Sequence, residues 1–256
     1  MKHTHRLVLA GAVMAVAAAC GGGGDLLDRL DLAPPAVRLV NASPLDPSAT
    51  LYRDGRRLDD ATTQLTYKYE SNYFDVSEET QADWEVRDAA AGRTIYFGTT
   101  DIQRGNKYSF VVLQTSATTS GVFAINDPYN KNLGTEKTRL RVVNGAYNAA
   151  SVDVYLNAPG TDIIAVSPFI SGALFRNSQP LSGDDAKGIS GGDYQVRVTT
   201  AGSKTDVLFA GTLSFGNNQD LMLIPVINDA QPARVKLLMV IEGAGNRQIS
   251  ELTDTP

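Results

Sequence analysis

Hydrophobic and polar residues alternate in short runs from Ala36 almost to the end of the chain. The runs are rich in Val, Ile, Tyr and Thr and are broken by Gly, Asn, Asp and Pro, which is typical of antiparallel strands joined by tight turns. Trp84 and Val86, for example, alternate with polar neighbours, which predicts one buried and one solvated face. We therefore expect an all-β protein in which Trp84, the sole tryptophan, is a core residue rather than a ligand platform.

The same pattern places the individual strands. In the first half they are predicted at 37–41, 50–53, 64–69, 73–76, 83–88, 94–97, 107–115 and 121–125. In the second half they are predicted at 140–144, 152–156, 162–166, 169–175, 194–199, 206–210, 221–226 and 235–241. Asp54-Gly55 is a hairpin turn signal, 188–193 reads as a glycine-rich turn, and 126–134 reads as a polar linker.

The chain contains an internal repeat. Arg38-Leu39-Val40-Asn41 returns 103 residues later as Arg141-Val142-Val143-Asn144, an offset close to the length of a small β-sandwich. Further along, 84–87 aligns with 194–197, and 102–106 aligns with 213–217. The repeat predicts two tandem domains, at residues 36–132 and 133–256.

Two segments carry a resemblance to a known family. Arg38 to Pro44 and Val152-Asp153-Val154-Tyr155 resemble the opening strand and a later strand of a bacterial family, domain of unknown function 4397. The resemblance implies two tandem immunoglobulin-like antiparallel β-sandwich domains in a secreted or lipid-anchored protein. It implies nothing specific about activity.

The first nineteen residues are typical of an export signal, with Lys2 and Arg6, a short apolar core, and small residues before Cys20. This arrangement resembles a lipoprotein signal. The resemblance implies that Cys20 is lipidated and becomes the N-terminus, that 20–35 is a flexible tether, and that the membrane is a partner through the lipid. Gly21, in place of Asp, favours the outer membrane of the cell envelope. The alternative is a plain secretory signal that leaves Cys20 as a free thiol.

Charge and residue inventory narrow the function. The net charge of −5 argues against a nucleic-acid partner, which needs clustered cations. Removal of the leader would remove both histidines and leave no free thiol, so a Ser-His-Asp triad, a Cys-His dyad and the usual zinc sites are excluded from the mature chain. We therefore predict a non-enzymatic protein with no catalytic residues, no cofactor and no metal site.

Three hypotheses remain for its role. The first is a lipid-anchored binding, adhesion or structural module with an envelope protein or glycan as partner. The second is a carboxylate-dependent glycan-acting enzyme, which needs a facing pair of acids; the third is a passive spacer. The acidic doublets are Asp59-Asp60, Glu78-Glu79 and Asp184-Asp185, all in turn-like surroundings, and the densest aromatic cluster is Tyr67, Tyr69, Tyr73 and Phe74. A calcium site is disfavoured because the chain has no Asp-x-Asp-x-Asp loop.

Overall fold

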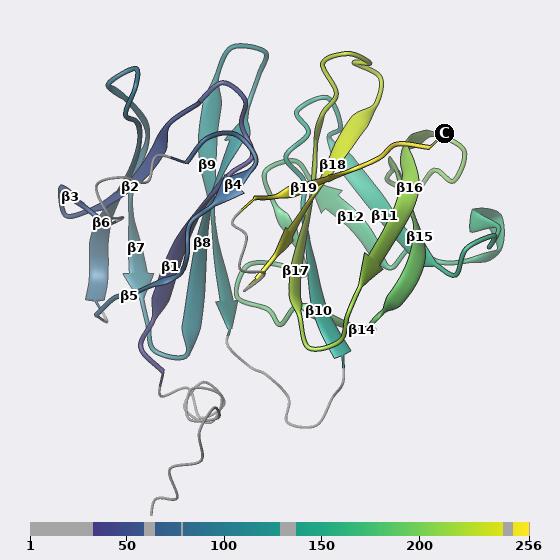
Figure 1. The fold of residues 1–256 in the computed structure, drawn as a ribbon, viewed down its shortest axis with the longest axis horizontal. Helices are drawn as coiled ribbons and strands as arrows, with labels where there is room; N and C mark the ends of the chain where they lie inside the picture. The colour runs from purple at the N-terminus through teal and green to yellow at the C-terminus, as the bar shows by residue number, and fades with distance from the viewer. Residues whose placement is uncertain (1–32, 59–64, 78, 129–136, 243–247, 256) are drawn as a thin grey trace, which may run out of the picture.

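The protein is all-β and forms two β-sandwiches side by side, as predicted (Figure 1). The computed structural model describes residues 33–58, 65–77, 79–128, 137–242 and 248–255. Within them the one helical segment is a 3-10 turn, η1 (Ile163–Ala165), and no helix is long and apolar enough to cross a membrane.

The first sandwich contains β1 (Ala36–Asn41), β2 (Ala49–Arg53), β3 (Arg56–Arg57), β4 (Tyr69–Glu70), β5 (Phe74–Asp75), β6 (Glu79–Asp88), β7 (Arg93–Ile102), β8 (Asn106–Gln114) and β9 (Ser120–Pro128). The second contains β10 (Lys137–Val143), β11 (Ser151–Asn157), β12 (Ile170–Leu174), β13 (Ser178–Gln179), β14 (Lys187–Ser190), β15 (Gly192–Thr200), β16 (Val207–Phe215), β17 (Asp220–Ile227), β18 (Val235–Ile241) and β19 (Ser250–Leu252).

The two sandwiches have matching topologies. In the first, a sheet ordered β4-β1-β8-β9 packs on a sheet ordered β3-β2-β6-β7. In the second, β13-β10-β17-β18-β19 packs on β12-β11-β15-β16. Pairing is antiparallel except for β1 with β8 and β10 with β17, which are parallel. One parallel pair in each sandwich is therefore the exception to the predicted antiparallel arrangement.

Each sandwich encloses its own apolar core. Trp84 is fully buried in the first core, with its ring centroid 5.0 Å from that of Phe110, which confirms its predicted core position. In the second core the large aromatic residue Phe209, which comes from β16, is also fully buried. Two self-contained cores agree with the alternating strand pattern of the sequence.

The repeated asparagine plays the same structural role in both sandwiches. The Nδ2 group of Asn41 donates to the carbonyl oxygens of Asp46 and Leu65, and its Oδ1 accepts from the Ser43 amide. Asn144 repeats this pattern with the carbonyl oxygens of Ala149 and Ala173 and the Ala146 amide. Both asparagines are fully buried. They satisfy backbone groups at the bend that follows the first strand, which explains why the motif recurs.

In the later part of the repeat, the strand pairing shifts the equivalent positions by two residues relative to the alignment predicted from the sequence. Tyr52 pairs with Glu85, whereas the equivalent Tyr155 pairs with Arg197, so Glu85 corresponds to Arg197 rather than to Gln195. The turns before β8 and β17 show the same shift, because Gly105 and Asn218 both have positive φ, 71° and 59°. The predicted alignment of 84–87 with 194–197 was therefore wrong, and the pairing register gives the correct equivalence.

A third apolar cluster joins the two sandwiches. The sheets that contain β1 and β10 face each other, and strands β8 and β17 are buried on both sides. In β8, Phe110 and Val112 point into the first core, while Val111 and Leu113 point into the contact between sandwiches. The buried members of this cluster are Val40, Ala42, Val111, Leu113, Ile125, Val143, Met222, Ile224, Val226, Leu238, Val240 and Ile249.

Polar contacts surround this interface. Arg141 is almost completely buried and its Nη2 lies 3.1 Å from Asp127 of the first sandwich. The Asn126 amide donates to Ser182 Oγ at 2.8 Å, and Lys107 pairs with Glu242. The four sheets thus form four packed layers, and the two sandwiches are docked through an extensive apolar surface.

Several local predictions were wrong. The segment 162–166 is not a strand: Asp162 accepts from the Ile164 amide and caps η1. Asn126 to Pro128 belong to β9 rather than to a linker, because they pair with the start of β8. Residues 187–190 form β14, which pairs with β10, where a turn was expected. The short strands β3, β13 and β19 were also missed. The boundary predicted at 132/133 lies outside the described residues and stays a prediction.

Candidate functional site

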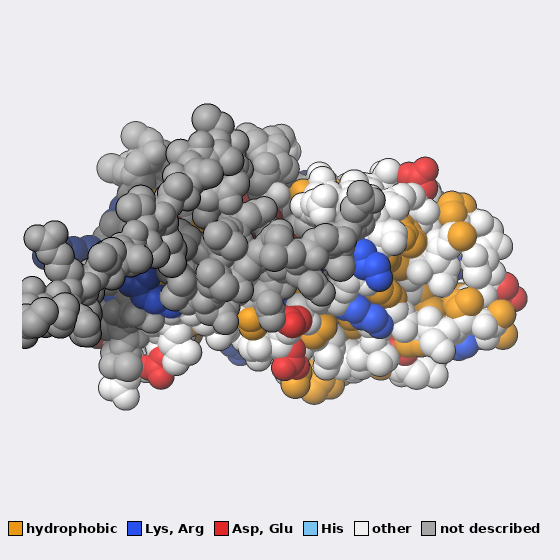
Figure 2. Space-filling model, turned by 90° about the horizontal axis from the view of Figure 1, so that it is seen from below, with side chains coloured by type: hydrophobic (Ala, Val, Ile, Leu, Met, Phe, Trp, Pro, Cys, Tyr) orange, Lys and Arg blue, Asp and Glu red, His pale blue; other side chains and the backbone are white. Residues whose placement is uncertain are grey.

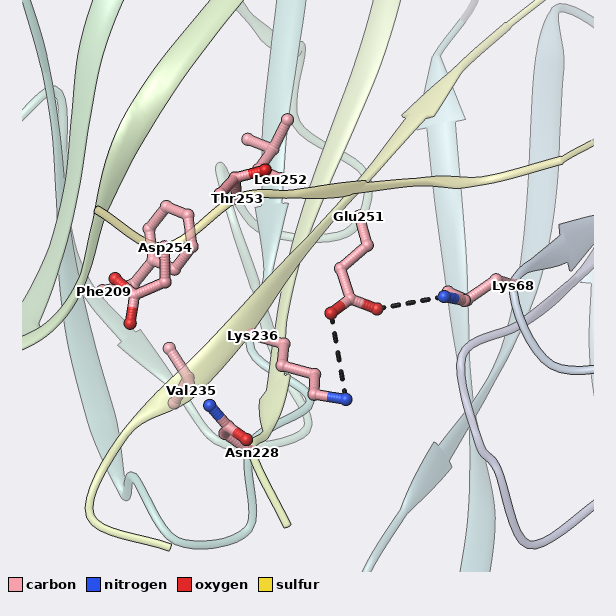
Figure 3. Close-up of a pocket in the computed structure, with 9 residues that line it drawn as sticks. All are labelled: Lys68, Phe209, Asn228, Val235, Lys236, Glu251, Leu252, Thr253 and Asp254. Carbon is pink, nitrogen blue, oxygen red and sulfur yellow. Dashed lines mark hydrogen bonds and ion pairs between the residues drawn. The ribbon is translucent and has the colours of Figure 1, made fainter. Parts of the chain in front are cut away.

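One hollow in the described part of the molecule lies where the two sandwiches meet (Figure 3). Its volume is about 430 Å³, which is within the range of small-molecule sites. Lys68 comes from the first sandwich and the remaining lining residues come from the second. The lining consists of Lys68, Phe209, Asn228, Val235, Lys236, Glu251, Leu252, Thr253 and Asp254.

The C-terminal run builds one wall of this junction pocket. Gln248 forms a bridge with Tyr69 of the first sandwich, and the Ile249 amide donates to the Lys68 carbonyl oxygen at 2.8 Å. The run then pairs with β18 as β19 and continues to β16, where the Thr255 amide donates to Ala210. It therefore crosses from one sandwich over both sheets of the other.

Two lysines converge on one carboxylate in the pocket, and Figure 3 shows them on either side of it. Lys68 Nζ lies 3.0 Å from Glu251 Oε2, and Lys236 Nζ lies 3.8 Å from Glu251 Oε1. All three side chains are about one third exposed. The Lys236 contact is the longer of the two, and the two ammonium groups share a single carboxylate.

The other carboxylate of the pocket is used within the fold. Asp254 Oδ1 accepts from Arg234 Nη2 at 2.7 Å and from the Ala210 amide at 3.1 Å. These contacts fasten the C-terminal run to the edge of β16 and neutralise the Asp254 charge.

The floor of the pocket is apolar. Val235 and Phe209 are fully buried and Leu252 is half-buried. Behind Lys68, the Tyr67 ring lies 5.5 Å from the ammonium. Burial, with the nearby Glu251 and Asp229 charges, raises the pKa of Tyr67 to about 12. Tyr67 is therefore a neutral, packed ring at neutral pH.

This arrangement suits binding by hydrogen bonds and charge. It presents ammonium groups and an asparagine above an apolar floor, and the structure shows no hydroxyl or thiol nucleophile paired with a base among its lining residues. Elsewhere in the described ranges, no three His, Cys, Asp or Glu side chains come together as metal ligands would.

The sequence-based candidates are dispersed. Cys20, Asp59, Asp60 and Glu78 lie outside the described residues, as does the side chain of Glu79. Asp184 and Asp185 are exposed on a loop whose Asp184 carbonyl accepts from Arg141.

The four aromatic residues that are close in sequence do not form one platform. Phe74 packs against the first core and Tyr67 against the interface cluster. Tyr73 lies with its ring centroid 4.8 Å from the Arg38 guanidinium, and burial raises its pKa well above the usual value. Only Tyr69, at 38%, is appreciably exposed.

Sequence reasoning did not find the junction pocket. Lys68, Lys236 and Glu251 belong to segments that the chain brings together across up to 183 positions. None of them sits in a motif, so only the docking of the sandwiches could have revealed them.

Comparison with known proteins identifies part of the chain. Residues 35–155 match the family described as Domain of unknown function (DUF4397), so the chain contains a DUF4397 domain there. The matched span covers the first sandwich and ends within β11 of the second. No curated protein matches the chain.

Among solved structures, two carbohydrate-binding modules are weakly similar. One is a family 26 module from Eubacterium rectale in complex with maltoheptaose, with 8% identity, a TM-score of 0.25, and coverage of 86% of this chain and 98% of that one. The other is a family 41 module from streptococcal virulence factors, with 11% identity, a TM-score of 0.23, and coverage of 78% and 95%. Scores this low say nothing about what this chain binds.

Proposed function

We propose that this protein is a non-enzymatic, lipid-anchored binding module of the cell envelope. The observation that carries the binding role is the pocket at the sandwich junction, which has the size of a small-molecule site and is lined by residues of both sandwiches. The apolar contact that fixes the two sandwiches together supports the role, because a ligand site shared by two domains needs a fixed geometry.

We also propose that both sandwiches are DUF4397 units. The support comes from the matching strand order and from the shared hydrogen bonds of Asn41 and Asn144. On this view the family match at 35–155 reflects one complete unit and the opening strands of the next.

The anchor is the lipid on Cys20, supported by the signal-like leader. Several acyl chains hold a protein stably at a bilayer without a transmembrane helix. Growth with labelled palmitate tests this point. Wild-type protein should carry the label and sediment with membranes, whereas Cys20→Ala should lose both properties. An unlabelled, soluble wild-type protein would instead support a plain secretory signal.

The two roles that compete with binding are a glycan-acting enzyme and a passive spacer. A glycan-acting enzyme would need facing carboxylates, and Glu251 and Asp254 both line the pocket, although each is paired with a cation. Incubation of the mature protein with envelope glycans separates the roles. New reducing ends that disappear in Glu251→Gln would overturn the non-enzymatic proposal, and unchanged glycans would uphold it.

The outer membrane is the proposed location, and the side of the membrane decides between capture of external ligands and service as a periplasmic scaffold. Figure 2 shows the lower end of the molecule, where hydrophobic side chains are spread over the second sandwich among Lys, Arg, Asp and Glu. Protease treatment of intact cells with a tag after Pro256 distinguishes the sides. Digestion places the sandwiches outside, and protection until permeabilisation places them in the periplasm.

A further inference from the structure

We infer that the junction pocket binds a saccharide that carries a carboxylate, with Lys68 and Lys236 as its anion-binding groups. This inference rests on the proposed binding function and names its ligand class. Three features of the pocket lead to it: its charge balance, the distribution of its polar groups, and the position of Glu251.

The charges that line the pocket do not cancel. Asp254 is neutralised by Arg234 at 2.7 Å, outside the lining. The remaining charged groups are the ammonium groups of Lys68 and Lys236 and the single carboxylate of Glu251. One positive charge is therefore in excess, and an ammonium group one third exposed can accept an anionic ligand without full desolvation.

The polar groups surround the opening rather than form one point of contact. Asn228 follows β17, Lys236 lies in β18, Lys68 precedes β4, and Thr253 follows β19. Groups that approach from four segments suit a ligand with hydroxyls on several sides. Leu252, the half-buried apolar residue of the lining, offers a contact for the C–H face of a sugar ring.

Glu251 occupies the place that the ligand carboxylate would take. Its two oxygens face two different ammonium groups, at 3.0 and 3.8 Å. Because Glu251 is the second residue of the three-residue edge strand β19, which pairs with β18 alone, it can move more easily than a residue in a central strand. It is thus an internal competitor that a sugar acid must displace.

Calorimetric titration of the mature protein with glucuronic acid, and with glucose as the neutral control, tests this inference. We expect binding of glucuronic acid, weaker binding at high salt, and little binding of glucose. Lys236→Met should weaken binding by about tenfold, as expected for loss of a charge-assisted hydrogen bond. Glu251→Gln should strengthen it several-fold, because the internal competitor is lost.

Lys137→Met is the matched control, since Lys137 is exposed at the start of β10 and lies outside the pocket lining. It should bind as the wild type does. Urea unfolding of each variant shows whether a loss of affinity reflects a loss of fold. Lys68→Met serves as a second variant, because it removes the other ammonium group of the pocket, which comes from the first sandwich.

The outcomes separate this inference from the proposed function. Equal affinity for glucose and glucuronic acid, or unchanged affinity in Lys236→Met and Lys68→Met, would overturn the inference and leave the binding role standing. Absence of glucuronic acid binding in every variant, Glu251→Gln included, would also overturn it. Cleavage of a glucuronide by the wild type would overturn the non-enzymatic function while the pocket remained the site.

Discussion

Tyr52 and Tyr155 occupy the same position in the two repeats, yet their surroundings differ. Tyr155 is 2% exposed, and its pairing partner Arg197 donates from Nη1 to the carbonyl oxygen of Thr161, in the connection after β11, at 3.3 Å. Tyr52 is half-buried and is followed by the tight Asp54-Gly55 turn, and the Arg87 guanidinium lies 4.2 Å from its ring centroid. The two tyrosines therefore share a position in the strand pairing but differ in burial.

This difference predicts the largest effect of substitution. Tyr155→Ala should lower the free energy of unfolding by about 3–5 kcal/mol, because removal of a large buried ring leaves a cavity. Tyr52→Ala should cost about 1–2 kcal/mol, since the half-buried ring loses partial packing and one cation–π contact. Urea unfolding of both variants measures the difference. Equal costs would show that the two outer faces are covered alike.

Asn41 and Asn144 test a feature that the two sandwiches share, because both side chains make the same set of hydrogen bonds. Asn41→Ala and Asn144→Ala should each cost about 2–4 kcal/mol, because each removes three hydrogen bonds to buried backbone groups. The two losses should agree within about 0.5 kcal/mol, whereas those of the tyrosines should not. Chemical unfolding of the single variants checks this. A large cost at only one position would mean that the hydrogen-bonded bend is not a common element.

The sequence predicted the common elements better than the differences. Alternation predicted the all-β class and most of the strands, because a period of two depends on local backbone geometry. The docking of the sandwiches does have a signal in the sequence: 110–113 and 221–227 contain no polar side chain, as expected for strands buried on both faces. The junction pocket had no such signal, because its residues meet only after docking.

A smaller effect is expected at the interface, where the repeats again diverge. Ala42 corresponds to Gly145, and a Cβ atom added at Gly145 would lie 2.5 Å from Leu113 Cδ2 and 3.2 Å from the Pro225 carbonyl oxygen. Gly145→Ala should therefore cost about 1–3 kcal/mol through overpacking. Ala42→Gly, the matched change, should cost about 1 kcal/mol through added chain entropy. Thermal unfolding of both variants measures this. A Gly145→Ala protein as stable as the wild type would mean that the sandwiches separate enough to admit a methyl group.

The smallest effect should occur at the open edge of the first sandwich. Phe97 pairs with Glu85 as Ala210 pairs with Arg197, but Ala210 bonds to the C-terminal run, whereas Phe97 is 65% exposed. Phe97→Thr keeps a residue that favours strands and should change the free energy of unfolding by no more than about 0.5 kcal/mol. A loss above about 1 kcal/mol, measured in urea, would show that Phe97 is covered in solution. In that case the β7 edge would be covered as the β16 edge is, and the two sandwiches would not differ in this respect.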